Sequence, residues 1–209
     1  SFESALLDAM MILEEKTGEN VLVGRSDEIT EFSFNITSRF GLYKRKISSN
    51  LDLFNNFSKG TIAGEGAAFF LLNNEPSEHN YAKLEGVQTF YKPSDASEVV
   101  RNIQSFLTEQ SLSMNDIDLI LCGRNGDSRG DKIYDHLNNA IFGKTTIVHY
   151  KHLCGEYPTS TGFALWLAAG IVKNGSMPHI YPNPGKKEVG RILIFNHYQM
   201  VHHSIMLVS

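Results

Sequence analysis

The sequence contains few of the features that mark extracellular, membrane or nucleic-acid-binding proteins. Its 209 residues include two cysteines, Cys122 and Cys154, which lie far apart in the chain. Two distant cysteines make no disulfide framework and favour a reducing compartment, so we predict a cytoplasmic protein. The 19 lysines and arginines are outnumbered by 23 aspartates and glutamates and form no long basic run. A nucleic acid or an anionic membrane surface is therefore not expected as a partner.

The sequence also lacks long apolar segments and metal-ligand motifs. The longest apolar stretch, Gly162–Val172, is shorter than the roughly 18 residues of a membrane span and contains two glycines. His149, His152 and Cys154 lie close together, but neither C-x-x-C nor H-x₃-H spacing occurs, and strand alternation turns His149 away from the loop. We predict no membrane span, no metal ion and no cofactor.

The clearest unit in the chain is Tyr150–Gly175, in which a polar, glycine-containing loop leads into an apolar helix. The helix is predicted over Ser160–Asn174, and the segment between Glu156 and Lys173 carries no charge. Thr145–Tyr150, which is rich in β-branched residues, is predicted to be the buried strand before the loop. A strand, loop and helix in this order present side chains at the carboxyl end of a sheet, where α/β proteins place their sites.

Residues 81–209 alternate between strand and helix patterns. Strands are predicted over 83–91, 118–122 and 145–150, and helices over 97–110, 130–142 and 160–174. Ser94 or Ser97 is expected to cap the first of these helices. Two further strands, 191–196 and 204–208, close the chain with a spacing that permits a hairpin. The alternation predicts an α/β fold with a mainly parallel sheet covered by helices.

Residues 1–74 repeat part of this order in a shorter form. The predicted elements are a helix over Ser1–Lys16, a strand over Asn20–Val23, a long excursion with one or two short helices over 31–60, and a strand over Ala67–Leu72. A polar link, Asn73–Asn80, separates two predicted units, residues 1–74 and 81–209. The order in the first unit resembles the end of the second, as in a duplicated half-fold with a truncated first copy. Since the helix pattern starts at Ser1, we expect a fragment of a longer chain.

Four segments stand out in order along the chain. They are SFESALLDAMMILEEKTGENVLVGRSDEI at the start, GTIAGEGAAFFLL from Gly60, KHLCGE from Lys151 and NHYQMVHHSIMLV from Asn196. Together they resemble the nucleophile helix and strand, the G-E-G-A strand, the K-x-x-x-G-H loop and the closing glycine turn of the β-ketoacyl synthases. The resemblance implies a thiolase-like α/β fold. This chain would hold the C-terminal half of the duplicated βαβαβαββ fold plus the last helix and strands of the first half.

The resemblance implies a Claisen condensation, in which a cysteine takes an acyl group from a carrier-protein thioester and two histidines assist decarboxylation of a malonyl partner. In this chain the expected cysteine falls at or just before Ser1. Asn125 lies where the first histidine belongs, and Lys151 matches the family's lysine, but Glu156 replaces the second histidine. Asn125, Lys151 and Glu156 thus match the family's active site, and the sequence assigns a catalytic role to none of them.

These replacements change what such a site can do. An imidazole can donate a hydrogen bond to an enolate, whereas an ionised Glu156 only accepts, and its charge opposes the developing anion. Asn125 retains donors. The closing turn, with Tyr198, Gln199 and Met200, lacks the family's glycines, so Gln199 and Met200 are expected to resist a positive φ and close approach of a substrate. We interpret these three residues as candidates for lining a substrate tunnel.

Several side chains have two interpretations on sequence alone. Lys151 is either a retained site lysine or a loop cation that pairs with Glu156. Glu156 is either a replacement with a role or a solvated residue near a helix N-terminus. Segment Gly123–Asp131 either cradles a phosphate of a pantetheine arm or only connects a strand to a helix. Trp166 is expected in a helix–helix core, and Glu65 is expected to be a buried structural carboxylate.

The combined observations predict a non-catalytic subunit of the chain-length-factor type. It pairs with an active ketosynthase, or with a second copy of itself, in fatty-acid, polyketide or polyene lipid biosynthesis. Its other partner is an acyl carrier protein with a phosphopantetheine arm. The alternative is an active 3-oxoacyl-[acyl carrier protein] synthase whose nucleophilic cysteine lies upstream of Ser1. A third interpretation is a scaffold that only binds the carrier protein.

Overall fold

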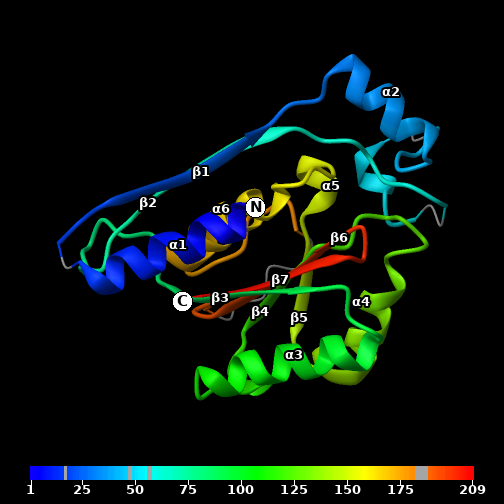
Figure 1. Ribbon diagram of the computed structural model, residues 1–209. Helices are drawn as coiled ribbons and strands as arrows, with labels where there is room; N and C mark the ends of the chain where they lie inside the picture. Colours follow the sequence, from blue (N-terminus) through cyan, green and yellow to red (C-terminus); the bar gives the residue numbers. More distant parts are fainter. Residues whose placement is uncertain (17, 47–48, 56–57, 182–187) are drawn as a thin grey trace.

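The computed structural model describes residues 1–16, 18–46, 49–55, 58–181 and 188–209. The strands of these residues form two sheets (Figure 1). A two-stranded antiparallel ribbon pairs β1 (Val21–Asp27) with β2 (Gly66–Leu72). The larger sheet has the order β3-β7-β6-β4-β5, with β3 at Leu84–Tyr91, β4 at Leu119–Cys122, β5 at Thr146–His149, β6 at Ile192–Tyr198 and β7 at His202–Val208.

Helices separate and cover the two sheets. They are α1 (Phe2–Glu15), α2 (Glu31–Arg39), α3 (Ala96–Glu109), α4 (Lys132–Leu137), α5 (Lys151–Cys154) and α6 (Ser160–Asn174), with 3₁₀ turns at Asn50–Asp52 and Met114–Asp116 and a π-helical turn at Asn138–Phe142. In Figure 1, α1 and α6 lie between the ribbon and the five-stranded sheet, and α3 lies on the opposite face of that sheet. An apolar cluster fills each side of the sheet. No helix in the described ranges is both long enough and apolar enough to cross a lipid bilayer.

The strand directions differ from the predicted mainly parallel sheet. Strand β4 is parallel to β5 and to β6, but β7 is antiparallel to both β6 and β3. The cause is the β6–β7 hairpin, which returns the chain into the sheet between β6 and β3 in the opposite direction. Apart from the single turn of α5, the order β3-α3-β4-α4-β5-α6-β6-β7 is the βαβαβαββ order that the resemblance implied.

Local signals predicted some elements closely and others only in outline. Helix α6 has the predicted bounds, and the predicted closing hairpin is present. Asp95 caps α3, rather than Ser94 or Ser97, because its carboxylate accepts the backbone N–H of Glu98 at 2.8 Å. The predicted helix over 130–142 consists of α4 and the π-helical turn that follows it.

Two side chains lie on the surface although the sequence suggested burial. Trp166 on α6 is 59% exposed and contacts the ring of Phe163, so the predicted helix–helix core position is wrong. Glu65 is exposed as well, and its Oε2 accepts the backbone N–H of Ile29 at 2.9 Å. Which face of an element is covered depends on neighbours distant in sequence, and local apolar content does not specify them.

Candidate functional site

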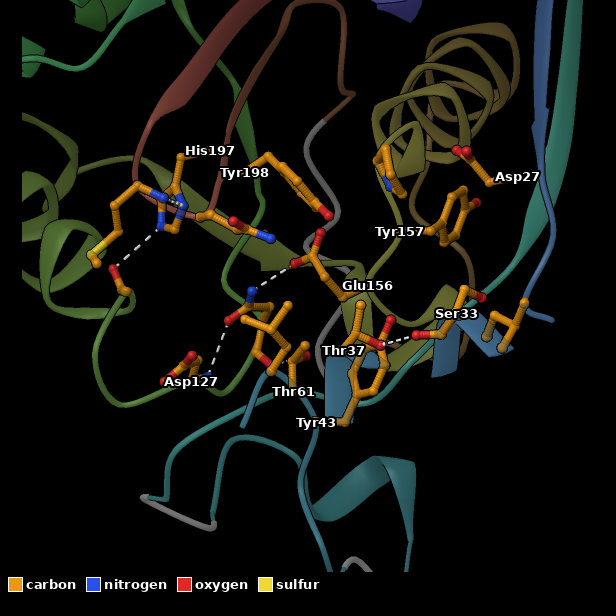
Figure 2. A pocket seen from close by; sticks show the side chains of 18 of the residues that line it. Asp27, Ser33, Thr37, Tyr43, Thr61, Asp127, Glu156, Tyr157, His197 and Tyr198 are labelled. Carbon is orange, nitrogen blue, oxygen red and sulfur yellow. Dashed lines mark hydrogen bonds between the residues drawn. The ribbon is translucent and has the colours of Figure 1, made fainter. Parts of the chain in front are cut away.

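A cavity of about 430 Å³ lies where the carboxyl ends of β4 and β6 face the end of β1 and helix α2. Its walls include Asn125 after β4, Tyr198 at the end of β6, Asp27 at the end of β1, and Ser33 and Thr37 of α2. Figure 2 shows Glu156 inside this cavity, between Tyr198 and Tyr157. The cavity is at the edge of the sheet where the sequence analysis expected a site.

The three positions that match the family's active site lie in direct contact. The ammonium Nζ of Lys151 donates to Oε1 of Glu156 at 2.6 Å, and the amide Nδ2 of Asn125 donates to Oε2 of Glu156 at 2.6 Å. Lys151 is fully buried and lies behind Glu156, while Glu156 and Asn125 reach the cavity wall. Of the two interpretations of Lys151, the structure therefore shows the cation paired with Glu156. Both oxygens of this carboxylate are occupied by protein donors.

The backbone around Glu156 is held by the glycine-rich segment before β2. The N–H of Glu156 donates to the carbonyl of Ile62 at 2.8 Å, and the N–H of Gly64 donates to the carbonyl of Glu156 at 3.1 Å. The two segments cross so closely that a Cβ on Gly155 would lie 2.6 Å from the Cα of Gly64. Gly155 also has a φ of 75°, which favours glycine. The G-E-G-A and K-x-x-x-G motifs therefore contact each other directly.

The loop after β4 is folded around a buried carboxylate. Asp131 accepts the backbone N–H groups of Asn125 at 3.1 Å and Gly126 at 2.9 Å, and it pairs with Nε of Arg124 at 3.2 Å. Burial raises the pKa of Asp131, against the lowering effect of these hydrogen bonds. Thr61 fixes the same loop from the other side by donating to the carbonyl of Asn125 at 2.6 Å. Two of the N–H groups with which this loop could bind a phosphate, those of Asn125 and Gly126, are thus used by Asp131.

The β6–β7 turn adopts the conformation that its side chains were expected to resist. Gln199 has a φ of 53° and Met200 a φ of 58°, a left-handed conformation that costs about 1–2 kcal/mol per residue. The N–H of Met200 donates to Nδ1 of His197 at 3.2 Å, and Nε2 of His203 donates to the carbonyl of Met200 at 3.3 Å. Two histidines thus hold the backbone N–H and carbonyl of Met200. Gln199 and Met200, together with Tyr198, line the cavity.

No protein-family model matches the sequence, and a search of curated proteins finds no significant match. Solved structures are similar. The structure of a type II PKS acyl-carrier protein in complex with its ketosynthase bound to the hexaketide matches 99% of this chain, with a TM-score of 0.81 and 16% identity. The ishigamide ketosynthase/chain length factor matches 99% with a TM-score of 0.79 and 15% identity. This chain has the ketosynthase fold.

A β-ketoacyl synthase from Burkholderia phymatum STM815 matches 100% of this chain as well, with a TM-score of 0.73 and 16% identity. The chain spans 60%, 58% and 59% of the length of these three matched chains. The predicted fold class, a thiolase-like α/β fold present in part, is therefore confirmed. The chemistry of the site has to be derived from its own residues.

Both cysteines of this chain lie in surroundings that disfavour the reactive thiolate. Burial raises the pKa of the Cys154 thiol to about 12, and its Sγ donates to the carbonyl of Gly155 at 3.3 Å. Burial also raises the pKa of Cys122 to about 12. Both thiols therefore stay protonated at neutral pH. In the part of the chain that the structure describes, no group of three histidine, cysteine or acidic side chains is placed to hold a metal ion.

His197 is a cavity residue that the sequence analysis did not single out. It is buried, and its ring stacks on Tyr134 with centroids 5.0 Å apart. Because Nδ1 accepts from Met200, Nε2 carries the proton and donates to the carbonyl of Gly130 at 3.3 Å. Burial lowers the pKa of His197 to about 3, so the ring is neutral and both nitrogens are engaged. A histidine inside an apolar strand gives no sequence signal of this role.

Asp27 is the second residue that was missed. Its Oδ2 accepts the backbone N–H of Thr159 at 2.9 Å and also the Thr159 hydroxyl, so it caps the start of α6. The predicted strand ended at Val23, whereas β1 continues to Asp27. The polar residues between them pair with β2 in a ribbon that has a solvent face, and alternation alone did not reveal this.

Proposed function

We propose that this chain is a non-catalytic, chain-length-factor-type subunit, which pairs with an active ketosynthase and shapes the cavity that holds an acyl chain. The observation that carries the proposal is the carboxylate of Glu156, held by Lys151 and Asn125 where the family resemblance calls for a histidine. The pathway class is fatty-acid, polyketide or polyene lipid synthesis. In this interpretation residues 1–74 form the end of the first half of the fold, and residues 81–209 form the second half.

The argument from chemistry concerns hydrogen-bond donors. Decarboxylative condensation builds negative charge on an enolate oxygen, and catalysis needs donors aimed at that oxygen. Among the described residues, the side-chain amide of Asn125 donates one N–H to Glu156, and both ring nitrogens of His197 are engaged with the backbone. The carboxylate of Glu156 adds negative charge at the same place. This arrangement supports a subunit that encloses an acyl chain rather than one that catalyses its condensation.

The proposed partners follow from the similar structures. One of them is a ketosynthase/chain length factor pair, and another is a ketosynthase with its acyl-carrier protein. By analogy, this chain pairs with an active ketosynthase or with a second copy of itself, and the pair meets an acyl carrier protein through its phosphopantetheine arm.

Co-expression of the full-length protein with candidate ketosynthases from the same genome tests the proposal. We expect a stable heteromer that condenses acyl and malonyl units, with all activity lost when the partner's nucleophilic cysteine is replaced. The matched change in this chain, the double variant Lys151→Met, Glu156→Gln, removes both charges of the buried pair and should leave the rate of condensation within about twofold. A homodimer of this protein that condenses malonyl units without any partner would contradict the proposal.

The alternative is an active 3-oxoacyl-[acyl carrier protein] synthase with a nucleophilic cysteine upstream of Ser1. The N-terminus of α1 favours it, because Ser1 caps this helix and a thiolate beside a helix N-terminus is stabilised. Incubation of the full-length protein with an acyl thioester, followed by intact-mass measurement, separates the two candidates. A mass increase of one acyl group, lost on replacing that cysteine, supports the enzyme.

A further inference from the structure

The carboxylates that line the cavity outnumber the cations. Two carboxylates in the wall are paired with cations: Glu156 with Lys151 at 2.6 Å, and Asp127 with Arg129 at 2.6 Å. Asp27 and Glu28 also line the cavity. Neither has a cation within ion-pair distance among the residues that the structure describes.

The charge of the lining cation, Arg129, is also balanced within the protein, by Asp127. Nε and Nη2 of Arg129 donate to the carboxylate of Asp127, and Nη2 donates to the carbonyl of Gly41 at 3.1 Å as well. The buried Lys151 is screened from the cavity by Glu156. A ligand carboxylate in this cavity would therefore meet two carboxylates that have no cation partner, Asp27 and Glu28, whereas Arg129 and Lys151 each already pair with a carboxylate.

Part of the remaining wall is aromatic and aliphatic. Tyr43, Tyr157 and Tyr198 line it, together with Ile29 and Leu42. Burial raises the pKa of Tyr157 and of Tyr198, and the negative charges of Glu156 and Asp27 raise both further, so these phenols stay neutral. Aromatic faces carry partial negative charge and add to the penalty for an anion.

We infer that the cavity holds the uncharged part of an acyl chain and excludes chains that end in a carboxylate, including the malonyl type of extender unit. The inference deepens the proposed function and rests on it in one respect, namely that the ligand is an acyl thioester. It assigns a substrate class to the cavity through two residues outside the matched positions, Asp27 and Glu28.

Three pantetheine thioesters with the same six-carbon chain test this selectivity. Hexanoyl-, adipoyl- and 6-aminohexanoyl-pantetheine end in a methyl group, a carboxylate and an ammonium group. Their affinities for the full-length protein, alone and paired with its ketosynthase, are measured by calorimetry. Both charged chains lose hydration in an apolar cavity. The ratio between these two affinities therefore reports the sign of the field. We expect the hexanoyl chain to bind best, and the amino chain to bind at least about fivefold more tightly than the adipoyl chain.

Paired variants assign the selectivity to the two carboxylates. The double variant Asp27→Asn, Glu28→Gln should reduce the amino-to-adipoyl ratio to about one. Asn at position 27 keeps an oxygen that accepts the N–H of Thr159, so the cap of α6 survives. The control Asp8→Asn, Glu14→Gln makes the same change in net charge on exposed positions of α1 and should leave the ratio unchanged.

The outcomes separate this inference from the proposed function. If the adipoyl chain binds as tightly as the amino chain, or if the double variant keeps the ratio, the charge selectivity is overturned while acyl binding stands. If the hexanoyl chain binds neither the protein alone nor its pair with the ketosynthase, both the inference and the proposed function are overturned.

Discussion

The five-stranded sheet and the β1–β2 ribbon meet at the cavity, and they differ in how much of their surface other elements of the chain cover. Strands β4 and β6 are buried along almost their whole length, whereas one face of the ribbon exposes Leu22 at 68%, Phe69 at 63% and Leu71 at 65%. Helix α2 has no buried residue. Yet β2 carries the apolar run AAFFLL, typical of a strand covered on both faces. Similar apolar runs are thus covered on both faces in one part and on one face in the other.

The difference bears on the site because each wall of the cavity comes from a different part. The wall with Asn125, Glu156 and His197 lies at the end of the fully packed sheet, and each of these side chains is held by protein partners. The opposite wall, with Ser33 and Thr37, belongs to α2. We therefore expect the first wall to be rigid and sensitive to substitution, and the second to tolerate change.

The largest expected effect comes from breaking the buried ion pair. Lys151→Met leaves the Glu156 carboxylate buried without its cation and should lower the free energy of unfolding by about 3–5 kcal/mol, measured by urea denaturation. Adding Glu156→Gln should restore more than half of the loss. The control Lys83→Met removes the cation of a pair in which the lysine is largely exposed and should cost less than about 1 kcal/mol. Equal losses for both lysine variants would contradict the rigid wall.

A matched pair of leucine truncations tests the coverage of the two sheets. Leu207→Ala in β7, where the side chain is fully buried, should cost about 2–5 kcal/mol of unfolding free energy. Leu71→Ala on the outer face of the ribbon should change it by less than about 0.5 kcal/mol. A large loss from the Leu71 variant would show that this face is covered in the protein as it exists in solution.

The buried histidine makes the stability of the packed wall dependent on pH. The folded-state pKa of His197 is about 3, below its ordinary value of 6.5, because burial disfavours the charged ring. The unfolded chain therefore binds the proton first, and stability is lost as pH falls from about 6.5 towards 3. Between pH 7 and pH 5 this group should cost about 2 kcal/mol. Urea denaturation of His197→Gln should show a smaller loss of unfolding free energy over that pH range. The control His202→Gln, at an exposed position, should show the same loss as the unsubstituted protein. An unchanged loss in His197→Gln would contradict the assignment.

The smallest expected effect is a gain of stability at the β6–β7 turn. Glycine at position 199 or 200 removes the strain of a left-handed side-chain residue and should add about 1 kcal/mol each. Ser111→Gly is the matched control, because Ser111 has a φ of 58° and lies away from the cavity. All three variants should raise the melting temperature. A loss of stability at 199 or 200 alone would show that side-chain contacts outweigh the backbone strain.

The sequence predicted the elements whose signals are local. The bounds of α6 follow from an uninterrupted apolar helix that ends at Gly175, and the family resemblance indicated that Asn125, Lys151 and Glu156 share one site. Partners distant in sequence decided the rest. Asp27 caps a helix more than a hundred residues away, so no local pattern identifies it. His197 is neutral because it is buried among elements distant in sequence, and backbone groups of Gly130 and Met200 engage its ring nitrogens.

The most direct test of the central claim is the release of CO₂ from malonyl-[acyl carrier protein] by the full-length protein without a partner. The claim is that Glu156, fixed by Lys151 and Asn125, places a negative charge where the condensing reaction needs a hydrogen-bond donor. The account predicts a rate equal to the uncatalysed background for both the unsubstituted protein and Glu156→Gln. Release well above background that Glu156→Gln abolishes would contradict it.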